Sequence, residues 1–177
     1  METKGIRFDI KSIDAAGVFE GYAATWDLDL GGDIIRQGAF SKSLNDNGGD
    51  VPIFWNHTEL IGRNMAARQD AKGLWVRGQI NMDVQRGREA HSLAKQGAVK
   101  ALSIGYQSIP DKTEHDAAGN RILKELKWFE YSLTPMPMNP AAEITSVKEH
   151  DSQRDEAVKA LRGAAHDLKE FYRKMVE

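Results

Sequence analysis

Residues 99–109 read Val99-Lys-Ala-Leu-Ser-Ile-Gly-Tyr-Gln-Ser-Ile109 and alternate as the residues of a β-strand do. One face carries the small side chains of Ala101, Ser103 and Gly105, and the opposite face carries large apolar side chains. The small neighbours on both sides of Ser103 leave room for another chain or a substrate to approach its hydroxyl. The alternative interpretation is a serine that fills a crowded position in a sheet.

The rest of the first 145 residues is also mainly β in character. Alternation and a high content of β-branched and aromatic residues predict strands over 6–13, 18–26, 51–55, 73–82 and 121–133. The first two of these are expected to form a hairpin around the turn at 14–17. Helices are predicted over 38–44 and 83–96, each followed by glycine-containing sequence. The fold class is therefore mainly β with flanking helices (α+β).

The last 30 residues differ in character from the rest. Residues 148–177 contain one glycine and no proline, and their apolar residues recur at helical spacing. Seven basic and seven acidic side chains balance one another in this segment. These features predict a β domain over 1–147 and a C-terminal amphipathic helical tail over 148–177. The helix could pack on the β domain, or it could bind a partner or a second copy of the chain.

Composition excludes several classes of function. The chain has 177 residues with 24 basic and 26 acidic side chains, and this balance gives no net-charge argument for nucleic-acid binding. Cysteine is absent, which excludes thiol catalysis, disulfides and thiolate metal sites. No metal-ligand spacing and no phosphate-binding loop is present, so no metal or cofactor is expected. No signal peptide or membrane-spanning run is found, so a soluble intracellular protein with no membrane partner is expected.

Two further residues stand out as candidates for chemistry. His57 follows an apolar strand end, where partial desolvation suits a general base that works near neutral pH. A histidine that merely packs in a loop is the alternative. Glu130 interrupts the apolar strand predicted over 121–133, and burying an unpaired carboxylate there would be costly. Glu130 therefore either faces solvent or has a partner in the interior, for which an imidazole is the natural choice.

Six motifs in order along the chain resemble one protein family. They are Gly21-Tyr-Ala-Ala24 with Trp26, Gln37-Gly-Ala-Phe-Ser-Lys-Ser-Leu44, Asn56-His57 with Ile61-Gly-Arg63, Gly73-Leu-Trp-Val-Arg-Gly78, Gly97-Ala-Val-Lys-Ala-Leu-Ser-Ile-Gly-Tyr106, and Glu130-Tyr-Ser-Leu-Thr-Pro-Met-Pro-Met-Asn-Pro-Ala141. Together they resemble the prohead (capsid maturation) proteases of tailed bacteriophages, which share the fold of the herpesvirus capsid protease, assemblin. The resemblance covers residues 5–147, and its small departures are Thr134 and Met138, where the family usually has valine and alanine.

The resemblance implies a serine endopeptidase on a closed or partly closed assemblin-like β-barrel. Ser103 would be the nucleophile and His57 its general base. The assemblins use a second histidine as the third member of the site, but here we favour Glu130, with His115 and His91 as lesser candidates. Arg63 is a possible helper of backbone N–H groups in stabilising an oxyanion.

The resemblance also implies the partners of the protein. Its substrates would be the major capsid protein, scaffold segments and the protease itself, and it would act inside the immature phage capsid (prohead) in the host cytoplasm. A homo-oligomer that forms through the C-terminal helix is a further possibility.

Two other functions fit the same sequence. One is a catalytically inactive homologue that binds capsid protein as a scaffold. The other is an unrelated β-barrel binding module, in which Ser103 and His57 would lie far apart.

Overall fold

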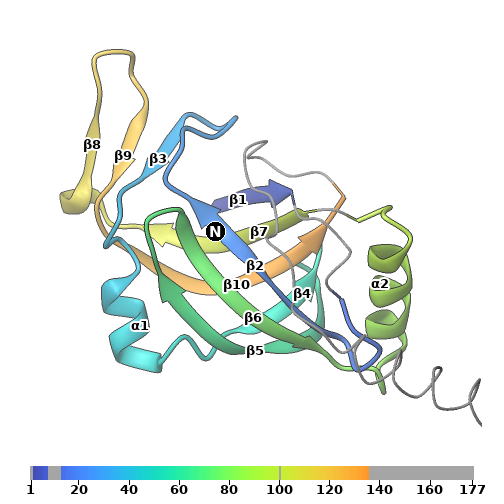
Figure 1. Ribbon diagram of the computed structural model, residues 1–177. Coiled ribbons are helices and arrows are strands. Elements are labelled where there is room, and N and C mark those ends of the chain that lie inside the picture. The colour runs from blue at the N-terminus through green and yellow to red at the C-terminus, as the bar shows by residue number, and fades with distance from the viewer. Residues whose placement is uncertain (1, 8–12, 100, 136–177) are drawn as a thin grey trace, which may run out of the picture. The chain divides into compact units, whose positions relative to one another are not determined.

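The large sheet of the molecule curls into a half-barrel. The computed structural model describes residues 2–7, 13–99 and 101–135. Seven strands form the sheet, in the order β1 (Glu2–Arg7), β7 (Ala101–Ser108), β10 (Leu126–Thr134), β4 (Pro52–Trp55), β5 (Glu59–Gln69), β6 (Gly73–Ile80) and β2 (Val18–Thr25). β4 and β10 are parallel, and every other neighbouring pair is antiparallel. The two end strands, β1 and β2, lie near one another, so the sheet is partly closed, as predicted (Figure 1).

The turn of the predicted N-terminal hairpin is present, whereas most of its first strand, residues 8–12, lies outside the described residues. Asp14 accepts hydrogen bonds from the backbone N–H groups of Gly17 and Val18, which closes a tight turn. In the described ranges, β1 pairs with β7, and β2 pairs with β6. Local alternation identifies strands but says nothing about distant partners, and here each strand pairs across the barrel.

β5 was not predicted as a strand because β-bulges interrupt its alternation. The β5–β6 register shifts between Asn64 and Ala66, which leaves Met65 as the extra residue, with its side chain 48% exposed. A second shift lies in the β4–β5 pair between Ile53 and Phe54. At a bulge the inward-facing positions change from odd-numbered to even-numbered residues, or the reverse. A search for strict alternation of apolar and polar residues therefore misses such a strand.

A second, three-stranded sheet is joined to the large one through the buried carboxylate of Asp33. Its strands have the order β3 (Asp33–Ile35), β9 (Arg121–Leu123) and β8 (Thr113–His115). A 3₁₀ turn at Pro110–Lys112 directly precedes β8 in the chain. Asp33 accepts two hydrogen bonds from the Arg121 guanidinium and one from the Tyr106 hydroxyl, each of 2.7 Å. Tyr106 belongs to β7, so its bond to Asp33 joins the two sheets, whereas the Arg121 bonds hold β9 to β3 within the small sheet. The strand predicted over 121–133 is therefore two strands, β9 and β10, in different sheets.

Two helices flank the large sheet, as the sequence predicted. α1 (Ser41–Asn47) begins three residues later than expected, and its Ser43 hydroxyl donates to the Leu126 carbonyl and accepts from the Trp128 N–H of β10. α2 (Gln85–Lys95) contacts β5 and β6 and is followed by Gly97, whose φ is 83°. That left-handed conformation favours glycine and ends the helix as expected.

Aromatic and aliphatic side chains fill the interior of the half-barrel. Its largest fully buried side chains include those of Phe19, Phe40, Tyr106 and Tyr131. Burial raises the pKa of Tyr131 well above its usual range, so its hydroxyl stays protonated and donates to Asn64 at 3.0 Å. The C-terminal helix predicted over 148–177 and the domain boundary after residue 147 lie outside the described residues. No helix in the described part of the chain is long and apolar enough to cross a membrane.

Candidate active site

His57 lies in a tight turn between two strands of the large sheet. Residues 55–58 connect β4 to β5, and the Thr58 N–H donates to the Trp55 carbonyl at 3.0 Å. Both central residues of the turn, Asn56 and His57, have positive φ, at 48° and 62°. Asparagine and histidine adopt this conformation more often than most non-glycine residues, but at an energetic cost that the surrounding structure must offset. Such strain is concentrated at functional sites, where it fixes the direction of a side chain.

A β-bulge decides which residues of β10 face Ser103. In the β10–β7 ladder Trp128 pairs with Tyr106 and Glu130 pairs with Gly105, so Phe129 is the extra residue and its side chain is exposed. Before the bulge, the even-numbered residues of β10 face the core. After it the odd-numbered ones do, and the even-numbered Glu130 and Ser132 lie on the face of β7 that carries Ser103. The bulge therefore places a carboxylate beside Ser103.

Three predicted residues form a continuous hydrogen-bonded chain. His57 Nε2 lies 2.9 Å from Ser103 Oγ, and His57 Nδ1 lies 2.6 Å from Glu130 Oε1. The side chain of Glu130 is 5% exposed and that of His57 is 20% exposed, so the carboxylate is buried and the imidazole is partly open to solvent. A carboxylate beside Nδ1 holds the proton on that nitrogen and leaves Nε2 free to accept the proton of Ser103. The chain is thus arranged to activate a hydroxyl.

Ser132 is a fourth polar residue of the site, which the sequence analysis did not single out. Its Oγ accepts a hydrogen bond from the His57 backbone N–H at 2.9 Å and donates one to Glu130 Oε2 at 2.9 Å. The same oxygen lies 3.3 Å from His57 Nδ1. Ser132 is two residues after Glu130 and therefore shares its face of the strand, which is a signal that alternation could have provided.

The space beside Ser103 is occupied by part of the site itself. A Cβ atom added at Gly105 would lie 2.0 Å from Glu130 Oε1, well inside contact distance. The missing side chain at Gly105 therefore makes room for the Glu130 carboxylate. The sequence had indicated room for an incoming chain or substrate at this point.

The two other histidines considered as third members lie elsewhere. His91 is buried in α2, and its Nε2 lies 2.7 Å from the Asp14 carbonyl, which joins the helix to the turn before β2. His115 is exposed on β8 of the small sheet. The ring nitrogens of His57 lie beside Glu130 and Ser103, and His91 contacts the Asp14 carbonyl instead. In the described ranges, no group of three or more histidine, aspartate or glutamate residues is placed to hold a metal ion.

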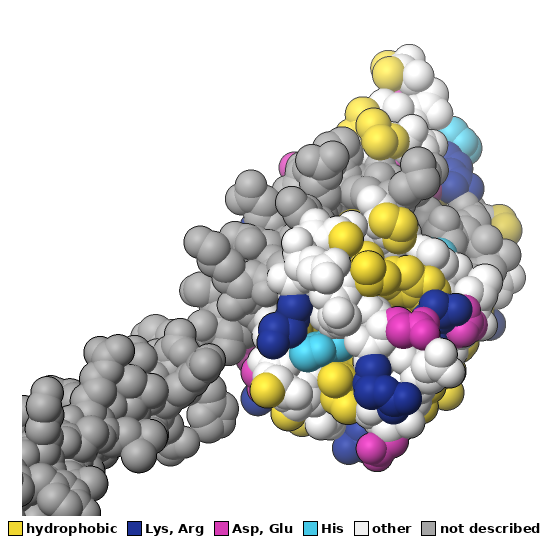
Figure 2. Space-filling view, turned by 90° about the vertical axis from the view of Figure 1, so that its right-hand side faces the viewer, with side chains coloured by type: hydrophobic (Ala, Val, Ile, Leu, Met, Phe, Trp, Pro, Cys, Tyr) yellow, Lys and Arg dark blue, Asp and Glu magenta, His cyan; other side chains and the backbone are white. Residues whose placement is uncertain are grey.

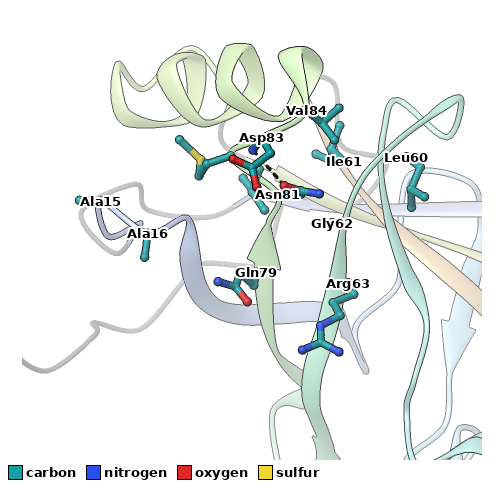
Figure 3. Close-up of a pocket in the computed structure, with 12 residues that line it drawn as sticks. Ala15, Ala16, Leu60, Ile61, Gly62, Arg63, Gln79, Asn81, Asp83 and Val84 are labelled. Carbon is teal, nitrogen blue, oxygen red and sulfur yellow. Dashed lines mark hydrogen bonds between the residues drawn. The ribbon is translucent and has the colours of Figure 1, made fainter.

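A pocket lies at the edge of the large sheet where β5 begins, shortly after His57 in the chain. It is bounded by the start of β5, the end of β6 and the segment between β6 and α2, and Figure 3 shows Arg63 and Asp83 among its lining residues. Leu60 and Val84, which also line it, have exposed apolar side chains. Figure 2 shows that hydrophobic side chains gather on one face of the molecule beside interspersed basic and acidic ones. The pocket offers an apolar recess with one cation and one carboxylate.

Sequence comparison links the chain to phage capsid proteases. Residues 6–156 match the family model of the caudovirus prohead serine proteases. The prohead protease of Enterobacteria phage HK97 is 34% identical over 140 residues, which cover 76% of this chain and 62% of the HK97 protein. The capsid polyprotein of Pseudomonas phage PAJU2 is 30% identical over 159 residues, 85% of this chain and 23% of the polyprotein. The chain spans less than two thirds of the length of either relative.

The fold also has a solved counterpart. The structure of the bacteriophage T4 capsid assembly protease matches with a TM-score of 0.51 and 11% identity, over 67% of this chain and 82% of that one. At this identity the likeness concerns the fold alone. The family match runs through β2–β10 and includes the segments that carry His57, Ser103 and Glu130. The resemblance predicted from the six motifs is therefore confirmed, and the chain belongs to the caudovirus prohead serine protease family.

Proposed function

We propose that this protein is a serine endopeptidase that cleaves proteins of the immature phage capsid. The observation that carries the proposal is the chain from Ser103 Oγ through the His57 imidazole to the Glu130 carboxylate, with contacts of 2.9 and 2.6 Å. A serine hydroxyl is a weak nucleophile until an adjacent base takes its proton. The 2.9 Å contact between Ser103 and His57 also disfavours an unrelated binding module, in which the two residues would lie far apart.

The geometry suits acyl transfer through a covalent intermediate. Ser103 Oγ attacks the scissile carbonyl carbon while His57 Nε2 takes the hydroxyl proton, which gives a tetrahedral intermediate and an imidazolium. Glu130 stabilises that imidazolium through the Nδ1–H hydrogen bond. The imidazolium then protonates the leaving amine, and a water molecule, deprotonated by His57, hydrolyses the acyl-serine. Backbone N–H groups, helped by Arg63, are the proposed donors to the oxyanion.

The substrates that we propose are the major capsid protein, scaffold segments and the protease chain itself. The HK97 relative is named a prohead protease, and the PAJU2 relative is a capsid polyprotein of which this chain matches 23%. The name of the HK97 relative supports a protease that works in the prohead, and the name of the PAJU2 relative supports a place beside capsid protein. We further propose that this prohead lies in the host cytoplasm.

Reaction with a fluorophosphonate reagent tests the proposed chemistry without knowledge of the substrate sequence. Ser103 Oγ forms a bond to phosphorus, the phosphorus–fluorine bond breaks, fluoride leaves and the proton passes to His57. We expect one adduct on Ser103 of the folded protein, found by intact mass and peptide mapping, and none on the unfolded chain. If no adduct forms on the folded protein, an inactive scaffold homologue becomes the better interpretation.

Gly105→Ala is expected to inactivate the site from the adjacent strand. The new methyl group would lie 2.0 Å from Glu130 Oε1, so the carboxylate must leave its place beside His57. We expect the labelling rate to fall by about 10²- to 10⁴-fold, toward the effect of losing the carboxylate. Overpacking should also lower the free energy of unfolding by about 1–3 kcal/mol.

Gly87→Ala in α2 is the matched control for this variant. Its added methyl group would lie 2.1 Å from the Asn81 carbonyl oxygen, so the crowding is similar but does not touch the site residues. Both variants should lose stability, measured by thermal unfolding, and only Gly105→Ala should lose labelling at a temperature where both are folded. Equal labelling rates would remove the argument that Gly105 makes room for a working carboxylate.

We also propose that residues 1–147 form the protease domain and that residues 148–177 form a separate helical tail. The change to helical spacing and balanced charge supports this division. The tail would mediate self-association or be removed by self-processing. Light scattering on the full chain tests the first role. Intact mass during prolonged incubation tests the second, because a self-processed chain becomes shorter in this region.

A further inference from the structure

The hydroxyl of Ser132 lies where the turn, the carboxylate and the nucleophile strand meet. Ser132 is fully buried, and in the β10–β7 ladder it pairs with Ser103 itself. Its Oγ accepts from the His57 backbone N–H and lies 2.9 Å from Glu130 Oε2. The Ser132 side chain therefore contacts both His57 and Glu130, and its residue lies opposite Ser103 in the neighbouring strand.

The position of the Ser132 hydroxyl proton follows from the surrounding contacts. A hydroxyl has one proton to donate, and the two possible acceptors near Ser132 are Glu130 Oε2 and His57 Nδ1. Nδ1 faces Glu130 Oε1 at 2.6 Å and must carry a proton to make that bond, so it is not an acceptor. The Ser132 proton therefore goes to Glu130 Oε2. Both carboxylate oxygens then accept a hydrogen bond, which fixes the carboxylate in rotation.

The same hydroxyl also holds the main chain of the His57 turn. His57 has φ of 62°, and its N–H bond to Ser132 is one of the contacts that keep this strained turn in place. The neighbouring Asn56 N–H donates to the Leu133 carbonyl at 3.1 Å, so β10 holds both residues of the turn. The imidazole is thus held at its backbone by Ser132 and at its ring by Glu130.

We propose that Ser132 is a positioning residue of the active site, which orients the Glu130 carboxylate and the His57 turn so that Nε2 faces Ser103. The proposal rests on the proposed peptidase function. Loss of the hydroxyl would leave Glu130 Oε2 and the His57 N–H without their partner, and the carboxylate would be free to rotate. A small misplacement of a catalytic group lowers its efficiency steeply, so the effect should appear in the rate of the chemical step.

Ser132→Ala tests this role through the rate of fluorophosphonate labelling at Ser103. We expect a 10- to 100-fold lower limiting rate at saturating reagent, with little change in the reagent concentration that gives half of that rate. Ser43→Ala is the matched control, because Ser43 is also a buried serine whose hydroxyl bridges two backbone groups of β10. It should lower the melting temperature comparably and leave the labelling rate unchanged.

A double-mutant cycle separates positioning from a general structural role. If Ser132 acts through Glu130, the loss of labelling rate that Ser132→Ala causes should disappear when Glu130→Gln is already present. A structural role would give the same loss in both backgrounds. The proposal is overturned if Ser132→Ala labels at the wild-type rate, or if its loss is undiminished beside Glu130→Gln. Absence of labelling in the wild type would instead overturn the proposed function.

Discussion

Ser103→Ala is expected to abolish cleavage of co-expressed major capsid protein, with a loss of roughly 10⁶-fold in kcat. Without the hydroxyl no acyl-enzyme can form, and only binding and oxyanion stabilisation remain to assist direct attack by water. Cleavage is followed by the mass of the capsid protein. The fold should survive, because Ser103 Oγ contacts the partly exposed His57, whose Nε2 can bond to water instead.

His57→Ala should reduce cleavage about as severely as Ser103→Ala, and the double variant should be no worse than either single one. Residues that act as one unit show this lack of additivity, because either loss alone removes the same step. Ser43→Ala, which removes a buried serine hydroxyl outside the site, should retain cleavage. Undiminished cleavage by Ser103→Ala would show that another residue is the nucleophile.

Local sequence pattern predicted the parts of this fold that depend on alternation alone. β6 lies within the strand predicted over 73–82 and alternates as that prediction requires, with Leu74, Val76 and Ile80 buried and Arg77 exposed. The small side chains around Ser103 and the carboxylate within an apolar strand were also visible in the sequence. Bringing Ser103, His57 and Glu130 together needed the family resemblance, because 46 residues separate Ser103 from His57 and 73 separate Glu130 from His57.

The features that escaped prediction depend on contacts between distant strands. The pairing of β1 with β7 is invisible to local alternation, and so is the bulge at Phe129. Without that bulge, the even-numbered residues of β10 would continue to face the core, and Glu130 would lie with Trp128 away from Ser103. Which face a strand residue takes after a bulge depends on its partner strand, and a single sequence does not contain that information. Ser132 was missed although alternation places it on the same face of the strand as Glu130.

Glu130→Gln is expected to lower kcat by about 10⁴-fold while it preserves the fold and substrate binding. Glutamine matches glutamate in shape, but one of its two terminal atoms is an amide nitrogen that donates hydrogen bonds. The Ser132 hydroxyl donates to the Oε2 position, so the glutamine oxygen should turn toward Ser132 and its NH₂ group toward His57 Nδ1. Nδ1 would then have to accept, and the ring proton would move to Nε2.

An imidazole with its proton on Nε2 is unable to take the proton of Ser103, so a correctly folded site would lack a general base. Steady-state cleavage should therefore show a fall in kcat with KM little changed, and the melting temperature should stay near that of the wild type. Asn64→Asp in β5 is the control, because it alters a buried amide outside the site whose burial is similar to that of Glu130. Asn64 accepts a hydrogen bond from the hydroxyl of Tyr131, which lies on the same strand as Glu130. That control should cost stability without a specific loss of kcat. If Glu130→Gln cleaves at the wild-type rate, orientation of His57 does not depend on this carboxylate, and the 2.6 Å contact between them is structural only.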